Sequence, residues 1–360
     1  MRQTIFINGR FLTKAVTGVQ RYALELLNHF DNLLNEEAYQ GLRLVCLAPP
    51  VDFIAPDWKN IELRRVGINR GNLWEQIDLA FYTGGHLLFS PANTGPFYYA
   101  NQVITLHDAS VFGVPNAYPA AFRAKYLFTF AILARIARMV LTDSHFSQTE
   151  LSHYLGVPAN RFKVILLGGD HLRDVAAAEG FLQKHGLVKG SYLLTVANQS
   201  PHKNFGRVLQ AATALQSEVE FAAAGGSYQG IFQQVETHSA PSNMHLLGYV
   251  NDHQLKALYE NALGFIFPSL YEGFGLPLLE AMNCGCPVLC SSAASLPEVG
   301  GDAALYFDPL QSNEMLDVIR KFLSDSGLRA QLQLRGREQA ALFTWEKTAR
   351  ETLAALVACL

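Results

Sequence analysis

The sequence of 360 residues lacks a strong excess of charge of either sign and lacks long apolar runs. Its 28 Lys and Arg residues nearly balance 31 Asp and Glu residues, which excludes the broad basic surface of a dedicated nucleic-acid-binding protein. No segment offers the ~18 to 20 uninterrupted apolar residues that a membrane-spanning helix needs. The N-terminus, MRQTIFING, has too short an apolar stretch for a signal peptide. We therefore expect a protein that stays in the cytosol.

Cysteine is also scarce, and its spacing forms no framework. The five cysteines are Cys46, Cys284, Cys286, Cys290 and Cys359. An odd number without regular spacing predicts reduced thiols in a reducing compartment. Cys284 and Cys286 have no second Cys or His pair at ligand spacing, so we expect them to be structural and to bind no metal.

Three phosphate- or metal-binding motifs are absent. The sequence has no Asp-x-Asp pair, so the carboxylate site that holds a divalent cation on a nucleotide sugar in one common transferase architecture has no candidate. It also has no G-x-x-x-x-G-K-[ST] and no G-x-G-x-x-G, which argues against P-loop and ordinary dinucleotide-binding enzymes. Any anion must therefore be bound by a different local site.

What the sequence does contain is an alternation of short apolar runs with helical patterns. Hydrophobic residues make up 49% and charged residues 16% of the chain, enough apolar side chain for a folded core. The alternation predicts βαβ units and parallel sheets. The strands expected in the first half are Thr4–Ile7, Leu42–Leu47, Ile61–Val66, Leu87–Phe89, Gln102–Leu106, Met139–Thr142 and Phe162–Leu166. Those expected in the second half are Tyr192–Ala197, Glu220–Ala224, Met244–Leu247, Gly264–Pro268, Pro287–Cys290 and Ala304–Phe307.

The two halves predict two doubly wound α/β domains. We place an N-terminal domain at residues 1–170, a connecting segment at 171–190, a C-terminal domain at 191–340, and a helix at 341–360 that packs back toward the first domain. Open α/β sheets bind ligands at the carboxyl ends of their strands. Two such sheets that face each other predict a functional cleft between the domains.

The strongest motif runs from Pro268 to Met282 and follows an expected strand. It contains two glycines, Gly273 and Gly275, before a helix with an early proline. Free N–H groups and the helix dipole at such a start favour an anion, most naturally a diphosphate. Glu272 in the loop and Glu280 one turn into the helix would accept hydrogen bonds from a hydroxyl-rich group. The alternative is that Glu280 only complements the helix dipole and that Glu272 is a solvated loop residue.

A second motif, Ser200 to Asn204, follows the first strand of the second half. Ser200 is placed to cap a helix, and Pro201 suits its first position. Lys203 and Arg207 would then share a face near the positive end of that helix, where an anion is needed to compensate them. We infer a pyrophosphate there; the alternative is two surface cations tolerated at small cost.

Three further features lie in the first half. Thr17 and Gln20 stand at capping-box spacing where a helix pattern begins at Gly18, and this glycine allows a close backbone approach. His107-Asp108 ends an expected strand and either faces the cleft or provides a packing imidazole. Ser144 follows another strand, where helix capping is favoured over substrate contact.

Two glycine-containing turns and one helix complete the candidates. Gly226, in Gly225-Gly226-Ser227, either lines a nucleotide or forms an ordinary turn, and Val250 would lie beside the base through its backbone. The segment 122–140 is basic and apolar but too short to span a bilayer. It either lies on an anionic membrane or is buried against the N-terminal sheet.

Together these residues resemble the family 4 glycosyltransferases, also called glycosyl transferases group 1, and in particular bacterial mannosyltransferases of O-antigen and exopolysaccharide synthesis. The resemblance is densest between residues 248 and 309, through Glu272-Gly273-Phe274-Gly275, Glu280-Ala281-Met282, Gly285-x-Pro287-Val288 and Leu296-Pro297-Glu298-Val299. It implies a GT-B fold, in which two Rossmann-like domains face across a cleft, with C-terminal helices. The acceptor would bind on the N-terminal side and the donor on the C-terminal side.

The resemblance also implies residue roles. Glu272 would contact the transferred sugar, Glu280 the ribose, and Lys203 the diphosphate, while His107 would lie near the reacting sugar. The family usually has Arg where this chain has His202, so the second cation would be titratable unless Arg207 substitutes. The donor-binding residues implied are Gly18, His202, Lys203, Arg207, Gly226, Val250, Gly273, Phe274, Gly275, Leu276 and Glu280, and the acceptor-side residues are Asp108 and Ser144.

The implied function is a retaining, metal-independent hexosyltransferase without a cofactor. Overall resemblance favours mannose from GDP-mannose, with UDP-hexoses and nucleotide-linked rhamnose as alternatives. The expected partners are a nucleotide sugar and a glycan acceptor, favoured to be lipid-linked, at the inner face of the cytoplasmic membrane. Two other interpretations stay open: a nucleotide-sugar 2-epimerase and a non-catalytic two-lobed sugar-binding or sensor protein.

Overall fold

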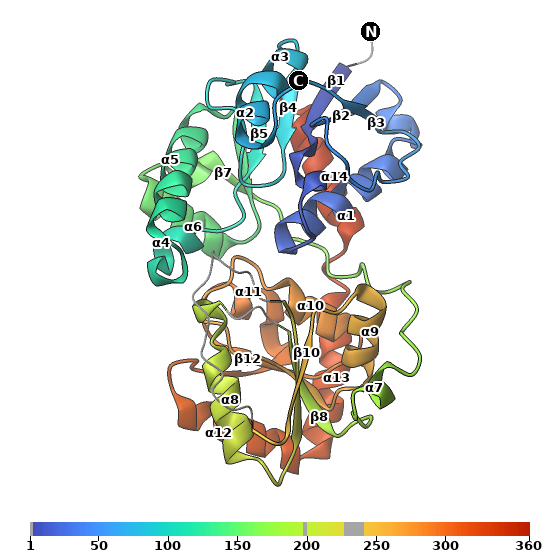
Figure 1. The fold of residues 1–360 in the computed structure, drawn as a ribbon, viewed down its shortest axis with the longest axis vertical. Helices are drawn as coiled ribbons and strands as arrows, with labels where there is room; N and C mark the ends of the chain where they lie inside the picture. Colours follow the sequence, from blue (N-terminus) through green and yellow to red (C-terminus); the bar gives the residue numbers. More distant parts are fainter. Residues whose placement is uncertain (1–2, 197–199, 227–240) are drawn as a thin grey trace. The chain divides into compact units, whose positions relative to one another are not determined.

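The computed structural model describes residues 3–196, 200–226 and 241–360. These residues form two compact units, which are described separately (Figure 1). The N-terminal unit contains the chain up to Ala109, together with Ala124–Leu167 and Trp345–Leu360. The C-terminal unit contains Ser110–Arg123 and Gly168–Thr344. Of the sequence-predicted elements, Ala197 and Ser227 lie outside the described residues.

The N-terminal unit is built on a parallel sheet of seven strands in the order β3-β2-β1-β4-β5-β6-β7. The strands are β1 (Gln3–Asn8), β2 (Leu42–Ala48), β3 (Glu62–Arg65), β4 (Leu87–Ser90), β5 (Gln102–Thr105), β6 (Met139–Thr142) and β7 (Phe162–Val164). All seven strand predictions are confirmed, with ends that differ by at most two residues. β1 pairs with β2 on one side and β4 on the other, so the order of connection reverses at β1. Ligands of open α/β sheets bind at such a switch point.

Helices and turns join these strands. The α-helices are α1 (Gly18–Leu33), α2 (Gly71–Leu73), α3 (Leu79–Tyr82), α5 (Ala120–Ile136), α6 (His145–Leu155) and α14 (Trp345–Val357). The shorter helical turns are η1 (Gly9–Thr13), η2 (Glu37–Tyr39), the π-helical η3 (Trp74–Asp78) and η5 (Ala159–Arg161). α1 buries Tyr22, Leu26 and Phe30 at the helical period. Figure 1 shows α14 beside α1, where the rings of Trp345 and Tyr22 lie 6.3 Å apart.

The start of α1 differs from its prediction in one detail. The helix begins at Gly18 as expected, with Thr17 as its N-cap residue. However, the Thr17 side chain accepts no hydrogen bond from the helix backbone, and its hydroxyl donates to the Gln20 side chain. The capping-box prediction is therefore wrong, because the two side chains satisfy each other instead of the first N–H groups of the helix.

The C-terminal unit is built on a second parallel sheet, of six strands, in the order β10-β9-β8-β11-β12-β13. They are β8 (Tyr192–Val196), β9 (Glu220–Ala224), β10 (Met244–Gly248), β11 (Gly264–Phe267), β12 (Val288–Ser291) and β13 (Ala304–Phe307). The six predicted strands are confirmed. β8 pairs with β9 and with β11, so the switch point of this sheet lies between β8 and β11.

The C-terminal unit also contains α-helices and short 3-10 turns. The α-helices are α4 (Ser110–Gly113), α7 (Phe181–Lys184), α8 (Phe205–Ala214), α9 (Asp252–Asn261), α10 (Leu276–Asn283), α11 (Leu296–Gly300), α12 (Ser312–Ser324) and α13 (Ser326–Ala340). The 3-10 turns are η4 (Pro115–Ala117), η6 (Pro201–Lys203) and η7 (Gly301–Ala303). α8 and α12 lie side by side in Figure 1, and their buried faces share one core with Phe221 and Phe307 of the sheet.

The helix after β8 begins later than the sequence indicated. Pro201, His202 and Lys203 form the separate 3-10 turn η6, and α8 begins only at Phe205. Between them Asn204 adopts a left-handed conformation, with φ of 58°, which interrupts the helix. The prediction that Lys203 and Arg207 share one helix face is therefore wrong.

The described residues contain no disulfide, and their five cysteines are free thiols. Burial raises the pKa of Cys284 to about 12. Within the described ranges, no group of three or more His, Cys, Asp or Glu side chains is placed to hold a metal ion. No helix in the described part of the chain is both long enough and apolar enough to cross a membrane.

Candidate functional site

The central contact of the candidate site joins the two loops that follow β8 and β11. The Nζ atom of Lys203 donates to both carboxylate oxygens of Glu272, at 2.7 Å and 3.0 Å. Both side chains are mostly buried, with 19% of Lys203 and 11% of Glu272 exposed. Because β8 and β11 are neighbours at the switch point, the fold brings together two residues that are 69 positions apart in sequence.

Backbone anchors hold both loops in place. The Ser295 hydroxyl donates to the carbonyl oxygen of Glu272 at 3.0 Å, and the Leu270 N–H donates to the carbonyl oxygen of His202 at 2.7 Å. The Asn204 amide donates to the carbonyls of Pro268 and Pro309. The positions of Lys203 and Glu272 are thus fixed by hydrogen bonds between the loops as well as by their own ion pair.

The glycine loop leads into α10 as its sequence predicts. Gly275 is the N-cap residue with φ of 100°, and Pro277 lies in the first turn. A Cβ atom at Gly275 would lie 2.5 Å from Leu296 Cδ2, so this position requires glycine both for its backbone angle and for its space. Phe274 is buried, with its ring edge-on to Phe343. Gly273 precedes it in the loop, and Leu276 is the first residue of α10, at the positive end of the helix dipole.

Glu280 lies one turn into α10, as predicted, but with partners that the sequence did not indicate. It is only 7% exposed. The Tyr259 hydroxyl donates to its Oε2 at 3.1 Å, and His171 Nε2 lies 3.2 Å from its Oε1. Burial, followed by the charge of Glu280, raises the pKa of Tyr259 well above its ordinary value, so this hydroxyl keeps its proton and donates a hydrogen bond to the carboxylate.

His202 is a buried, neutral histidine beside Lys203. Its side chain is buried, its Nδ1 lies 2.8 Å from Ser200 Oγ, and its ring stacks near Tyr118. Burial, followed by the charge of Lys203, lowers the pKa of His202 to about 3. The imidazole is therefore neutral at neutral pH in this structure, because its buried surroundings and the adjacent ammonium both disfavour its protonation. Its role toward a diphosphate stays a prediction.

Arg207 is engaged elsewhere. Its guanidinium donates to the Ser312 hydroxyl, to the carbonyl oxygen of Leu310 at 3.1 Å and to the Gln210 side chain at 3.1 Å. Ser312 and Leu310 flank the start of α12, so Arg207 fastens α8 to the segment before that helix.

The remaining donor-side predictions lie at the ends of β9 and β10. The N–H of Gly225, the residue before Gly226, donates to the carbonyl oxygen of Gly248 at 2.8 Å. Val250 lies two residues after Gly248 and is half-buried. Among the described residues, a Cβ atom at Gly226 would meet no atom within 4 Å. No contact in the structure tests either role.

The N-terminal unit carries a separate buried pair at the carboxyl ends of β5 and β6. His107 Nδ1 lies 2.7 Å from Asp143 Oδ2, and its Nε2 lies 2.9 Å from the carbonyl oxygen of Pro91. Burial opposes protonation of His107, but the charge and hydrogen bond of Asp143 raise its pKa. Both ring nitrogens of His107 therefore already have partners in the structure, and Tyr22 lies edge-on to the ring at 4.7 Å.

The other predictions in the N-terminal unit have local explanations. Ser144 is fully buried and caps α6 by accepting from the Ser147 N–H at 3.0 Å, which confirms the capping interpretation. Gly18 is exposed at the first position of α1. Asp108 is half-buried beside His107, and its charge contributes to the raised pKa of that imidazole.

Several residues around the site were not identified from sequence. Tyr259 and His171 contact Glu280, Asn204 turns the chain after Lys203, and Asp143 pairs with His107. Only Asn204 carried a local signal, because Asn tolerates the left-handed conformation. The others are single residues whose roles depend on contacts with distant segments.

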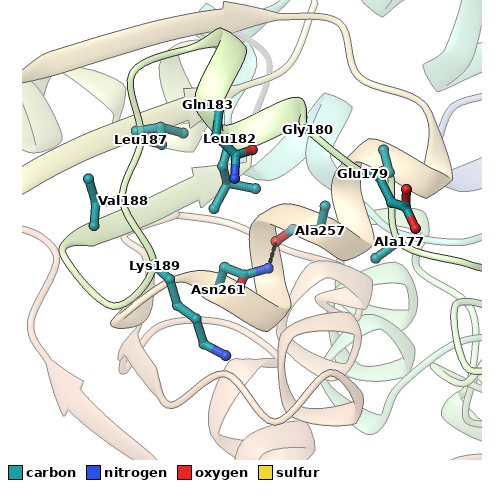
Figure 2. Close-up of a pocket in the computed structure, with 11 residues that line it drawn as sticks. Ala177, Glu179, Gly180, Leu182, Gln183, Leu187, Val188, Lys189, Ala257 and Asn261 are labelled. Atoms are coloured by element: carbon teal, nitrogen blue, oxygen red, sulfur yellow. Dashed lines mark hydrogen bonds between the residues drawn. The ribbon is translucent and has the colours of Figure 1, made fainter.

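A pocket in the C-terminal unit contains none of the predicted site residues. Figure 2 shows it between the connecting segment 177–189 and α9, with a volume of about 460 Å³. Its lining includes Leu182, Leu187 and Val188, and the Asn261 amide is turned to the carbonyl oxygen of Ala257 in its own helix. The pocket offers no pair of facing charged groups comparable to Lys203 and Glu272.

Comparisons with known proteins agree with the fold. The glycosyl transferases group 1 family matches residues 179–339. The O-antigen chain mannosyltransferase B of Escherichia coli is 31% identical over 94% of this chain and 95% of that protein. The serotype-specific mannosyltransferase WbdA of Escherichia coli is 29% identical over 97% of this chain and 44% of its own length, so this chain spans less than half of that relative.

Solved structures show the same fold. HepE of Anabaena, in complex with UDP and glucose, superposes with a TM-score of 0.73 at 17% identity and covers 99% of this chain and 100% of its own. The two parallel sheets and this structural similarity together identify the fold as GT-B. On its fold and on its similarity to mannosyltransferases of O-antigen synthesis over nearly its full length, the chain belongs to the glycosyl transferases group 1 family and is a glycosyltransferase.

Proposed function

We propose that this glycosyltransferase moves a mannosyl group from GDP-mannose to a glycan acceptor, with retention of the anomeric configuration and without a metal ion. The observation that carries the proposal is the Lys203–Glu272 pair at the switch point of the C-terminal sheet. It places a cation and a hydrogen-bond-accepting carboxylate side by side, which matches the two parts of a nucleotide sugar: a charged diphosphate and a hydroxyl-rich hexose.

Lys203 is the proposed contact for the diphosphate. Its ammonium, together with the N–H groups at the start of α10, would stabilise the negative charge that grows on the leaving diphosphate. A cation already fixed in this position supports a mechanism that needs no metal ion. Arg207 is left out of this set because its guanidinium is bonded beside the start of α12.

The two glutamates are proposed to recognise hydroxyl groups. Glu272 would accept from the transferred hexose, and Glu280 from the ribose, since ionised carboxylates accept hydrogen bonds and do not pair with phosphate. Tyr259 supports the second role, because its hydroxyl fixes one Glu280 oxygen and leaves further lone pairs for a ligand.

Retention requires that the acceptor oxygen attack the face from which the diphosphate departs. In the proposed step the bond between the sugar C1 and the diphosphate oxygen breaks, and a bond from C1 to the acceptor oxygen forms. The acceptor proton passes to the departing diphosphate. No covalent bond between sugar and enzyme is needed, and exclusion of water protects the donor from hydrolysis.

The mannosyl donor is favoured because the Escherichia coli relatives are named mannosyltransferases. The name of the first places it in O-antigen synthesis, so a surface glycan is the proposed acceptor and a lipid-linked carrier its proposed form. We include a cytoplasmic location at the inner membrane face in this proposal. Five free cysteines are compatible with a reducing compartment.

The proposal is tested by thermal shift with GDP, UDP, dTDP and ADP and with their sugar conjugates. A ligand that binds only the folded state stabilises it by about 2.7 kcal/mol at a hundredfold excess over Kd, so GDP and GDP-mannose should raise Tm most. NMR of the product formed from GDP-mannose should show the anomeric configuration of the donor. A selective shift with UDP would replace the donor assignment, and an inverted product would overturn retention.

A further inference from the structure

A second charged cluster lies in the N-terminal unit, at the carboxyl end of β1. Arg10, in the turn η1 that directly follows β1, has its Nη1 2.5 Å from Glu75 Oε2. Its Nη2 donates to Asn72 Oδ1 at 2.6 Å. The cluster therefore lies at the switch point of this sheet, on the element that follows its first strand.

Glu75 is a buried anchor for this arginine. Only 3% of its side chain is exposed, and its Oε1 accepts from the Asn8 amide at 2.9 Å and from the Thr94 hydroxyl at 2.7 Å. Asn8 in turn caps η1 by accepting from the Arg10 N–H at 3.2 Å. Both carboxylate oxygens are satisfied, so Glu75 holds the guanidinium in one orientation.

Two lysines extend the positive charge beyond this pair. Lys125 Nζ donates to Asn72 Oδ1 at 3.3 Å, which places the ammonium beside the same amide that Arg10 contacts. Lys14 directly follows η1, and the residue as a whole is exposed. Its amine is nevertheless partly buried, and this burial, followed by the charge of Arg10, lowers the pKa of the ammonium. The pKa of Lys125 is lowered by the same two causes.

The charges of this cluster do not balance. In the part of the chain that the structure describes, no carboxylate lies within 4.0 Å of the ammonium of Lys14 or Lys125. The charges of Arg10, Glu75 and Lys125 all act on the Lys14 ammonium, so three cations share the influence of one carboxylate, which is already bonded to Arg10. A doubly charged phosphoryl group would compensate this local excess, and guanidinium and ammonium groups are its usual partners.

Exposed apolar side chains adjoin the cluster. Leu73 and Ile77 lie on the same short helical segment as Asn72 and Glu75, and they are 61% and 53% exposed. Phe128 is 60% exposed and lies three residues after Lys125 on α5, so it shares a face with that lysine. η3 is also a π-helical turn, a distortion frequent at functional sites.

We infer that Arg10, Lys14 and Lys125 bind a phosphoryl group carried by the acceptor, of the class of lipid-linked phosphates and diphosphates. The cations supply the contacts for the phosphoryl oxygens, and the adjoining apolar side chains suit the hydrocarbon that bears it. The site itself is argued from the geometry of the N-terminal unit; its assignment to the acceptor rests on the proposed function.

The binding site is tested first, without turnover, by calorimetric titration with inorganic pyrophosphate at low salt. The Lys203→Gln background weakens the proposed donor-side contact, so the remaining binding reports on the N-terminal cluster. Lys14→Gln with Lys125→Gln should weaken that binding at least about tenfold, since charge-assisted hydrogen bonds are lost. Lys163→Gln, an exposed lysine on β7 of the same unit, is the matched control and should change nothing. Equal affinity in all variants would overturn the site.

The source of the phosphoryl group is tested by kinetics with two acceptors that share one glycan, one on a prenyl diphosphate and one on a neutral alkyl chain. The double lysine variant should raise KM about tenfold for the diphosphate acceptor alone, with unchanged donor KM. A higher donor KM with both acceptors would assign the group to the donor and overturn the inference. If pyrophosphate binding weakened while the KM values of both acceptors stayed the same, the cluster would be a site for free phosphate. That result would overturn the assignment to the acceptor. Absence of any transfer would contradict the proposed function, while the titration still decides the site.

Discussion

The ammonium group of Lys203 lies 2.7 Å from one carboxylate oxygen of Glu272 and 3.0 Å from the other. The two residues belong to different loops, and their contact depends on the adjacency of β8 and β11. A cation and an anion that satisfy each other in this way hold two loops of the proposed donor site together. Each of them is also proposed to contact a different part of the donor, so their structural and functional roles can be separated by substitution.

Removal of either partner should lower turnover more than it lowers stability. We expect Lys203→Met and Glu272→Gln each to reduce kcat/KM by about a hundredfold or more, as loss of transition-state charge stabilisation does. Unfolding by urea should show a cost of about 1–3 kcal/mol for each single change, and less than the sum for the double variant. Arg207→Ala, which removes a cation from the neighbouring helix, is the control and should keep donor KM. A donor KM that rises as much in this control as in Lys203→Met would return Arg207 to the donor site.

The neutral state of His202 has a consequence for stability at low pH. Its folded-state pKa is lowered to about 3, whereas histidine in an unfolded chain titrates near 6.5. The unfolded chain therefore binds a proton that the folded chain does not, and the free energy of unfolding should fall as the pH drops from about 6.5 toward about 3. Unfolding measured at several pH values should show a shallower fall for His202→Gln. The same slope in both proteins would mean that His202 is not buried as a neutral group.

The His107–Asp143 pair should have the opposite pH dependence. The pKa of His107 is raised by Asp143 despite burial, so the stability it contributes is fully present below about pH 6.5 and is lost as the pH rises through the raised value. Asp143→Asn removes the charge but keeps the shape. Its cost in free energy of unfolding, about 1–3 kcal/mol, should be larger at pH 6 than at pH 9. A cost that grows with pH would show that the pair does not hold the proton on the imidazole.

Gly275 should not tolerate a side chain. Its φ is 100°, and a Cβ atom at this position would lie 2.5 Å from the Leu296 side chain. We therefore expect Gly275→Ala to lose about 1–3 kcal/mol of stability and to displace the loop that carries Glu272. Thermal melting and turnover should both fall. Gly206→Ala in α8 is the matched control, because a Cβ atom there meets nothing within 4 Å. If the two variants melted alike, the loop would be less constrained than its geometry indicates.

Metal removal tests the proposed charge stabilisation by Lys203. Incubation with a chelator should leave transfer from the nucleotide sugar largely intact, because the proposed leaving-group contacts are the ammonium and backbone N–H groups. The measurement is the initial rate before and after chelation, with Mg²⁺ or Mn²⁺ added back. A strict and reversible requirement for a divalent ion would contradict the metal-independent mechanism.

Much of the fold follows from local sequence patterns. Strands such as β8 and β11 appear as short apolar runs, because strands of a parallel sheet are buried on both faces. The glycine loop before α10 and its early Pro277 were predicted correctly, since the backbone preferences of Gly and Pro act at their own positions. The prediction failed at Pro201, where a single helix was expected to continue through Asn204. The left-handed conformation of Asn204 is stabilised by amide hydrogen bonds to the distant Pro268 and Pro309.

In the candidate site, too, local sequence predicts some features and contacts with distant segments set the others. Local patterns predict which residues carry charge beside flexible loops, namely Lys203, Glu272 and Glu280, because these depend on residue type and on position after a strand. Their partners, Glu272 for Lys203 and Tyr259 for Glu280, come from the packing of distant segments. This packing also makes His202 neutral through burial. The physical reason is that hydrogen bonding and desolvation depend on which distant segments surround a side chain, and the order of strands in the sheet sets those neighbours.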